Sequence, residues 1–143
     1  MEQRLDIYQV EPTAYDGMFA LEKYLIESPL TLQQISLIKM RASQINGCAY
    51  CINMHTAEAI KSGETHQRLL LLSAWNESNR FTDEEKVMLK MTEEITEISN
   101  GGVTDKTFQR AKELFEEKTI IAIILAATTI NAWNRIAISS RMH

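Results

Sequence analysis

Two cysteines and a histidine lie close together near the middle of the chain, in the segment Gly47-Cys48-Ala49-Tyr50-Cys51-Ile52-Asn53-Met54-His55. If this C-x-x-C-x-x-x-H segment begins a helix, the three side chains share one narrow face, because successive residues are rotated by about 100°. Cys51 and His55 are then neighbours one turn apart, close enough for the imidazole to act on the sulfur. Glu58 follows on much the same face, where it could orient the imidazole or accept its proton.

The expected position of the Cys pair, Cys48 and Cys51, at the start of a helix also affects its reactivity. The first-turn N–H groups and the positive end of the helix dipole favour an anion. A thiol placed there beside a histidine can have its pKa lowered from about 8.5 to roughly 3.5–7.5. The resulting thiolate is a nucleophile, and the second cysteine can resolve the oxidised first one as a disulfide. The segment therefore favours a redox-active pair.

Two other interpretations of the Cys pair remain open. Cys48 and Cys51 could form a zinc site with His55 and His66, although the usual second pair of closely spaced ligands is missing. The pair could also be two inert buried thiols, since free cysteine packs well as a small hydrophobe.

Helical periodicity runs through nearly the whole chain, and the sequence contains only 5 Gly and 2 Pro. Threonines at 31, 65 and 82 are suited to cap helices, and Glu85 completes a capping box with Thr82. No run of alternating residues is strong enough to predict a strand. We predict a single all-α domain over 1–143 with about seven helices and with the Cys pair at the N-terminus of a central helix. The expected helices cover approximately residues 13–27, 31–45, 48–62, 65–75, 82–99, 104–115 and 119–139.

Composition limits the classes of function. The chain has 143 residues, of which 45% are hydrophobic and 24% charged, with a net charge of −4. These values are typical of a soluble globular domain, and no Lys/Arg block suggests a nucleic-acid or membrane partner. The N-terminal residues do not resemble a secretory signal. We therefore expect a cytoplasmic protein, and in that reducing compartment a Cys pair is more often catalytic or metal-binding than structural.

The most apolar stretch is Thr119–Ile130. It is too short to span a bilayer of about 30 Å, so we interpret it as part of a buried helix. Because this helix is apolar nearly all round, a second subunit could cover part of it, and we expect a homo-oligomer.

The segment from Lys39 to His55 (KMRASQINGCAYCINMH) resembles the signature of the alkylhydroperoxidase D (AhpD)-like proteins within the carboxymuconolactone decarboxylase family. The resemblance extends over roughly residues 15–140. Supporting segments are Gly63-Glu64, Trp75–Ser78, Phe81–Glu85 and Asn131–Arg135.

This resemblance implies an all-helical fold that assembles as trimers or hexamers and that reduces hydrogen peroxide or organic hydroperoxides in antioxidant defence. It implies that Cys51 is the peroxidatic residue, that Cys48 is the resolving residue and that His55 takes part in proton relay. It also implies a dithiol reductant, which in the best-known relatives is a lipoyl-bearing protein. No phosphate-binding loop, dinucleotide fingerprint or haem-attachment motif indicates a cofactor.

Two positions depart from the family pattern. The family's relay includes a Glu twelve residues before the first Cys, where this chain has Ser36, and Tyr50 stands where some relatives have a second His. A serine cannot act as a carboxylate base, so we expect a slow peroxidase unless Glu58, or a water held by Ser36, substitutes. Ser36 and Ser43 could line a polar pocket beside the Cys pair, or could simply bond back to the helix backbone.

Other functions remain possible on the same fold. A lactone decarboxylase, the activity that names the family, would not be expected to need a Cys pair. A redox sensor, a disulfide exchange protein or a binding module would remain compatible with the missing relay Glu.

Overall fold

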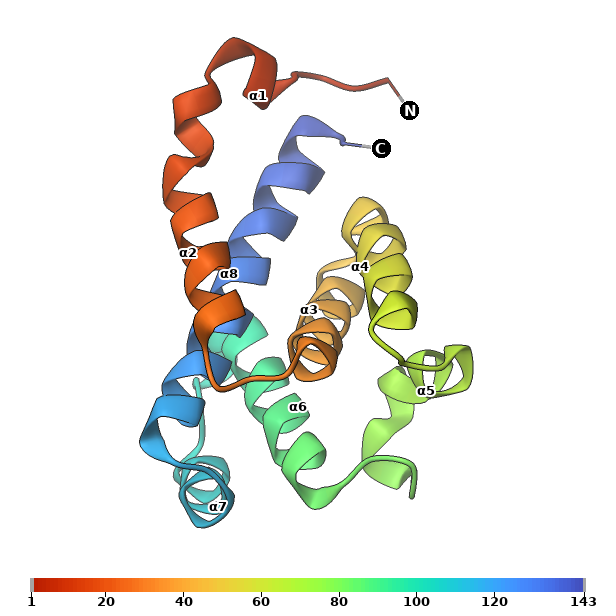
Figure 1. The fold of residues 1–143 in the computed structure, drawn as a ribbon, viewed down its shortest axis with the longest axis vertical. Helices are drawn as coiled ribbons and strands as arrows, with labels where there is room; N and C mark the ends of the chain where they lie inside the picture. The colour runs from red at the N-terminus through yellow and green to blue at the C-terminus, as the bar shows by residue number, and fades with distance from the viewer. Residues whose placement is uncertain (1, 143) are drawn as a thin grey trace.

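Helices form all of the regular secondary structure of residues 2–142 in the computed structural model of the protein, so the all-α prediction is confirmed (Figure 1). The predicted helices correspond to α2–α8. The short helix α1 was not predicted, because four residues are too few to show a period, whereas most of the 3₁₀ helix η1 lies inside the helix predicted over 13–27. The α-helices are α1 (Ile7–Val10), α2 (Asp16–Glu27), α3 (Leu32–Asn46), α4 (Ala49–Lys61), α5 (His66–Leu71), α6 (Asp83–Thr96), α7 (Asp105–Leu114) and α8 (Glu117–Ser140), and the 3₁₀ helices are η1 (Pro12–Tyr15), η2 (Leu72–Glu77) and η3 (Ile98–Asn100).

Threonine caps define where several of these helices begin. The side chains of Thr31, Thr65, Thr82 and Thr104 each accept a hydrogen bond from the backbone N–H three residues later. At α3 and α6 the residue in that third position bonds back to the cap backbone, which completes a capping box. These bonds satisfy N–H groups that the helix itself leaves without partners, so the helix starts are set by local sequence.

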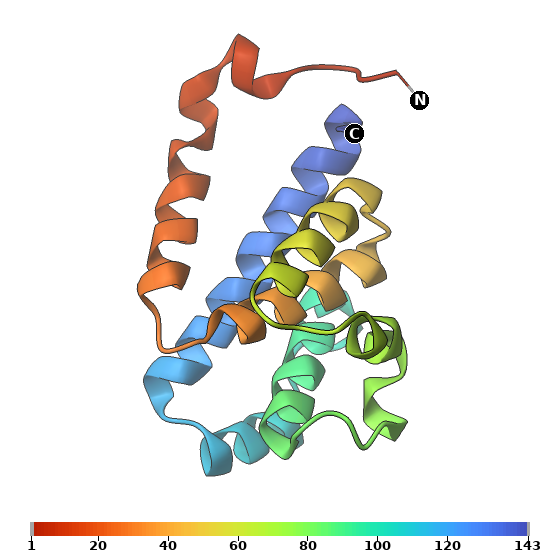
Figure 2. The same ribbon diagram turned by 45° about the vertical axis from the view of Figure 1, so that its right-hand side comes forward.

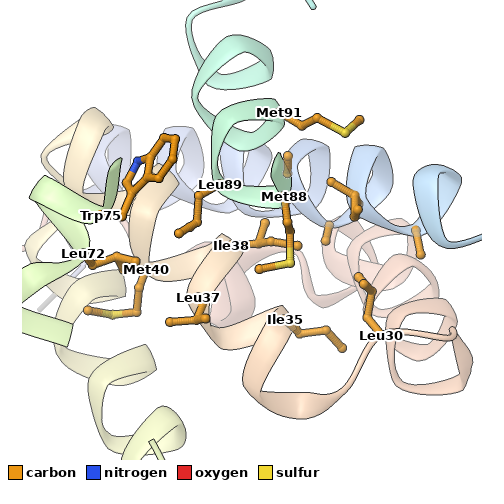
Figure 3. Close-up of a cluster of buried hydrophobic side chains, with 14 of the residues drawn as sticks. Leu30, Ile35, Leu37, Ile38, Met40, Leu72, Trp75, Met88, Leu89 and Met91 are labelled. Atoms are coloured by element: carbon orange, nitrogen blue, oxygen red, sulfur yellow. The ribbon is translucent and has the colours of Figure 1, made fainter. Parts of the chain in front are cut away.

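The core is built around α3, which packs against α4, α6 and α8. Leu37 and Ile38 of α3 are fully buried, as are Met88 and Leu89 of α6. Figure 3 shows these side chains meeting in one cluster, which extends towards Trp75 of η2. Burial on several sides fixes the direction of α3, and so fixes where the following turn and α4 begin.

The last helix, α8, is long and apolar enough to cross a membrane by length and composition. The prediction that it was too short counted only its most apolar stretch. Its packing assigns it to the core instead, because α8 lies against α2, α3 and α6 and its most apolar window is 56% buried. One chain therefore covers most of α8, leaving Ile121 and Ile138 exposed. The homo-oligomer stays a prediction that rests on the family resemblance, since α8 does not require one.

The segment that leads into α1 and the C-terminal end of α8 lie at the same end of the molecule in both views, close to where α4 starts (Figures 1 and 2). The backbone N–H of Arg4 donates to the carbonyl of Ser140 at 2.9 Å, so the N-terminal segment crosses the end of α8. The chain then turns through α1 and η1 into α2, which packs along α8. These N-terminal elements thereby form a wall beside α4.

Truncating the core at Ile38 should destabilise the whole domain. Ile38 is fully buried, so Ile38→Ala is expected to lower the free energy of unfolding by about 2–5 kcal/mol in chemical denaturation. The matched control is Ile26→Ala, at a residue that is 70% exposed, for which we expect a change within about 0.5 kcal/mol. Equal losses for the two variants would contradict the assignment of α3 as the central helix.

Candidate active site

The turn between α3 and α4 places the Cys pair at a helix start. Gly47 ends α3 with a φ of 69°, a left-handed conformation that glycine adopts without the steric cost of a Cβ. Cys48 follows as the N-cap residue of α4, and its Sγ accepts from the backbone N–H of Cys51 at 3.4 Å. The pair therefore lies within the first turn of α4, as the sequence predicted.

A buried network of amide side chains holds this turn against α8. Asn46 Nδ2 donates to Asn134 Oδ1 at 2.8 Å and to Asn131 Oδ1 at 2.9 Å. Asn134 Nδ2 in turn donates to Ser43 Oγ at 3.0 Å, and the Ser43 carbonyl accepts from the backbone N–H of Cys48 at 3.0 Å. Ser43 thus links the turn to α8, because its hydroxyl bonds to Asn134 and its carbonyl bonds to Cys48. Two asparagines three residues apart in a largely apolar helix were the sequence signal for this network.

Cys48 and Cys51 are joined in a disulfide, with their Cα atoms 5.4 Å apart. Both residues are almost completely buried, but they line different cavities. Cys51 lines a cavity of about 330 Å³, called here the Cys51 cavity, which His55 also lines. Cys48 lines a separate cavity of about 530 Å³, the Cys48 cavity, together with Arg4 and Arg141. The two cavities adjoin, since Tyr50, Ala137 and Met142 line both, so each cysteine of the pair borders its own cavity.

Aromatic and charged side chains enclose the Cys51 cavity. The indole of Trp133 on α8 packs edge-on against the ring of Tyr15, with centroids 5.1 Å apart, and Phe19 packs against both. α1 and η1 contribute Tyr8 and Tyr15 to the same wall, so the segment preceding α2 covers part of the site. The remaining lining residues are Glu22, Lys39, Tyr50, Met54, Glu58, Ala137 and Met142.

His55 is only 2% exposed, and its two ring nitrogens have different surroundings. Nδ1 lies 2.7 Å from Glu58 Oε2, whereas the buried Nε2 has no hydrogen-bond partner among residues 2–142. Because an ionised carboxylate can only accept, Nδ1 carries the proton and Nε2 carries the free lone pair. Burial lowers the pKa of His55, and the hydrogen bond that Nδ1 donates to Glu58 opposes this only in part. The imidazole is therefore a neutral base in the cavity that Cys51 also lines.

The other predicted residues are distributed over two adjoining cavities. Tyr50 and Glu58 line the Cys51 cavity. Ser36 does not; it lines a neighbouring cavity of about 420 Å³ that also touches Glu58. Ser36 is therefore not placed beside the Cys pair. His66 begins α5, and no three His, Cys, Asp or Glu side chains in residues 2–142 are grouped as metal ligands, so the zinc alternative lacks a ligand set.

Most other residues of the Cys51 cavity were missed from the sequence, including an ion pair and the tryptophan bonded to it. These are Glu22 on α2, Lys39 on α3 and Trp133 on α8, and Glu22 accepts from both of the others although the three lie far apart in the chain. Lys39 and Trp133 fall within segments that carried the family resemblance, but no spacing rule connects either of them to Glu22.

Comparisons with known proteins agree with this architecture. The family model described as the carboxymuconolactone decarboxylase family matches residues 12–94. The uncharacterised protein YdfG of Bacillus subtilis is 42% identical over 97% of this chain and 95% of its own. A crystal structure from Agrobacterium tumefaciens, of a protein of unknown function assigned to antioxidant defence as an AhpD, superposes with a TM-score of 0.95 at 37% identity, covering 99% of this chain and 97% of that one. An uncharacterised peroxidase-related protein from Silicibacter sp. shares the fold, with a TM-score of 0.83 at 21% identity over 95% of this chain and 72% of its own.

Removing Asn134 should loosen the turn that carries Cys48. Asn134→Ala leaves the Ser43 hydroxyl and the Asn46 amide without this buried partner, so we expect the free energy of unfolding to fall by about 1–3 kcal/mol. The control is Asn100→Ala at an exposed position of η3. If both variants unfold at the same denaturant concentration as the parent protein, the amide network does not hold the turn.

The buried neutral state of His55 should make stability depend on pH. Its pKa is lowered in the folded protein mainly by burial, so below about 6.5, the ordinary histidine value, the unfolded chain binds a proton that the folded one does not. This contribution leaves stability unchanged above that pH and reduces it as the pH falls towards the folded pKa, by at most about 1.4 kcal/mol per pH unit. Denaturation curves of the parent protein and of His55→Gln over this range measure it. Parallel pH profiles for the two proteins would exclude His55 as the source.

Proposed function

The chain belongs to the carboxymuconolactone decarboxylase family, and we propose that it is an AhpD-like thiol peroxidase that reduces hydrogen peroxide or organic hydroperoxides. The observation that carries the proposal is that Cys51 and His55 line the same cavity. The buried Nε2 of His55 has no hydrogen-bond partner among residues 2–142, so its lone pair is free to accept a proton. A base in that state can take the thiol proton of a reduced Cys51 and return it to a leaving oxygen. The strong similarity to a protein assigned to antioxidant defence supports the same chemistry.

In the first step, the proton of the Cys51 thiol passes to His55 Nε2, while Glu58 accepts the hydrogen bond from Nδ1 and stabilises the imidazolium that forms. The thiolate attacks one oxygen of the peroxide, so that an S–O bond forms as the O–O bond breaks. The departing alkoxide or hydroxide takes the proton back from His55. The sulfur is oxidised to a sulfenic acid, and the peroxide is reduced to an alcohol or to water.

In the second step, the Cys48 thiol attacks the sulfenic acid, which forms the disulfide and releases water. The disulfide in the structure corresponds to this oxidised state. A dithiol reductant then returns both cysteines to thiols and is itself converted to a disulfide. The separate cavity beside Cys48 supports attack of the reductant on Cys48, with Cys51 leaving as the thiolate beside His55. A lipoyl-bearing protein has the required dithiol chemistry.

We extend two further sequence expectations as part of this proposal. A cycle that depends on thiols needs a supply of reducing dithiols, which favours the cytoplasm. Assembly into trimers or hexamers follows from family membership and is measurable by light scattering of the purified protein.

Stopped-flow mixing of the reduced protein with hydrogen peroxide and with an organic hydroperoxide tests the peroxidase activity. We expect Cys51→Ser to abolish the reaction and Cys48→Ser to stop it at a sulfenic acid detectable by mass spectrometry. His55→Gln should slow it by about 10²–10⁴-fold, the usual contribution of a general base. His66→Gln, at an exposed histidine on α5, is the matched control and should react like the parent protein.

A rate no faster than that of free cysteine would overturn the peroxidase proposal. Disulfide exchange is the second candidate function. It is favoured by the closed disulfide at the start of α4 and by the access to Cys48 through its own cavity. The same sample would then be assayed for oxidation of a dithiol by the Cys48–Cys51 disulfide.

A further inference from the structure

A partly buried ion pair between Lys39 and Glu22 forms part of the wall of the Cys51 cavity. Lys39 Nζ donates to both carboxylate oxygens of Glu22, at 2.9 and 2.6 Å. Trp133 Nε1 donates to Glu22 Oε1 at 3.0 Å. The Lys39 side chain is 8% exposed and that of Glu22 is 26% exposed, so the ammonium is held well inside the protein. Three helices, α2, α3 and α8, therefore cooperate to fix one cation.

The geometry leaves Lys39 with an unused donor. An ammonium has three N–H groups, and the carboxylate of Glu22 engages two of them. Lys39 and Cys51 line the same cavity. When the disulfide is reduced, Cys51 becomes a thiol that can ionise to a thiolate, so the cavity then holds a cation and a group that can carry a negative charge.

We propose that the Lys39 ammonium is the residue that stabilises the Cys51 thiolate and donates a hydrogen bond to the departing peroxide oxygen, and that Glu22 and Trp133 are positioning residues for it. This inference rests on the proposed peroxidase function for the second role only. Stabilisation of the thiolate is a property of the reduced protein, with or without peroxide. In the peroxidase step, the electron pair and the proton move as described above, and Lys39 retains all of its protons.

Among the residues of 2–142 that line the Cys51 cavity, Lys39 is the one that carries a positive charge near pH 7. The titratable groups that face the Cys51 cavity from all the elements around it are Tyr8, Tyr15, Glu22, Lys39, Tyr50, His55 and Glu58. Tyrosines are neutral near pH 7, and His55 is kept neutral by burial. Both carboxylates have partners of their own, because Glu58 accepts from His55 and Glu22 accepts from Lys39. An opposite charge near a thiol favours its ionised form.

The positive charge of Lys39 influences the pKa of His55 on α4. Burial is the main cause of the lowered pKa of His55, and the charge of Lys39 lowers it further by more than Glu22 raises it. At His55 the charge of the Lys39 ammonium therefore has a larger effect than the opposite charge of Glu22. If Lys39 also has the larger effect at Cys51, it lowers the pKa of the Cys51 thiol, and it keeps His55 in the neutral form that accepts the thiol proton.

The test is the apparent pKa of Cys51 in a Cys48→Ser background, measured from the pH dependence of alkylation and from the ultraviolet absorbance of the thiolate. Lys39→Met should raise this pKa by at least about one unit, which is a tenfold loss of thiolate below the pKa. Glu22→Gln should lower it, because the ammonium loses its counterion while the amide oxygen can still accept from Lys39 and Trp133. Lys23→Met removes an exposed cation from the same region of α2 and should leave the pKa unchanged.

Opposite shifts for Lys39→Met and Glu22→Gln would support the proposal, since general loosening of the site would move both in the same direction. An unchanged pKa in Lys39→Met, or shifts of the same sign, would overturn it. If Lys39→Met does not fold, the downward shift in Glu22→Gln decides alone, and its absence is a negative result. None of these measurements uses peroxide, so a parent protein without peroxidase activity would sink the proposed function while the pKa comparison still gave its own answer.

Discussion

The hydrogen bonds of Asn134 fix the position of the turn that carries the Cys pair relative to the core helix α8. Asn134 accepts from Asn46 and donates to Ser43, and so holds the last turn of α3 against α8. The left-handed Gly47 then reverses the chain, and Cys48 begins α4. A small rotation of this turn would move the whole reactive face of α4 relative to the cavity. The amide network lies in the interior, where hydrogen bonds are strong and unpaired groups are costly, so it specifies a single arrangement.

His55 illustrates the cost of building this site. Its ring is almost fully buried, and one nitrogen lacks a partner among the described residues. A buried polar atom without a hydrogen bond costs about 1–3 kcal/mol. Glu58 offsets part of the cost at the other nitrogen and fixes which tautomer is present. An unsatisfied atom in a folded protein calls for an explanation, and the proposed peroxidase reaction offers one, because it needs a lone pair at this nitrogen to accept the thiol proton of Cys51.

The sequence could predict the features that depend on neighbouring residues. Periodicity and threonine caps predicted α2–α8, and the spacing of the motif predicted Cys48 and Cys51 at the start of one helix, with His55 and Glu58 following along it. It could not reveal the partnership of Glu22 with Lys39 and Trp133, because these residues are 17 and 111 positions apart and meet only through tertiary packing. Ser36 is an example of a residue that the sequence pattern singled out but that tertiary packing places elsewhere. Its place in the family pattern suggested a role near the pair, whereas the structure turns it towards an adjoining cavity.

Stability alone is a weak reason for the ion pair between Glu22 and Lys39. Removing two charges from water costs free energy that their attraction only partly returns, and a well-packed hydrophobic pair is often as stable. α2 also has other means of attachment, since it packs along α8 and buries Leu25 in the core. What the ion pair adds is a fixed positive charge in a cavity that also contains a sulfur and a neutral imidazole. A fixed charge that a hydrophobic pair could replace without loss of stability, and that lies in the same cavity as a cysteine, is more readily explained by the proposed reaction than by the fold.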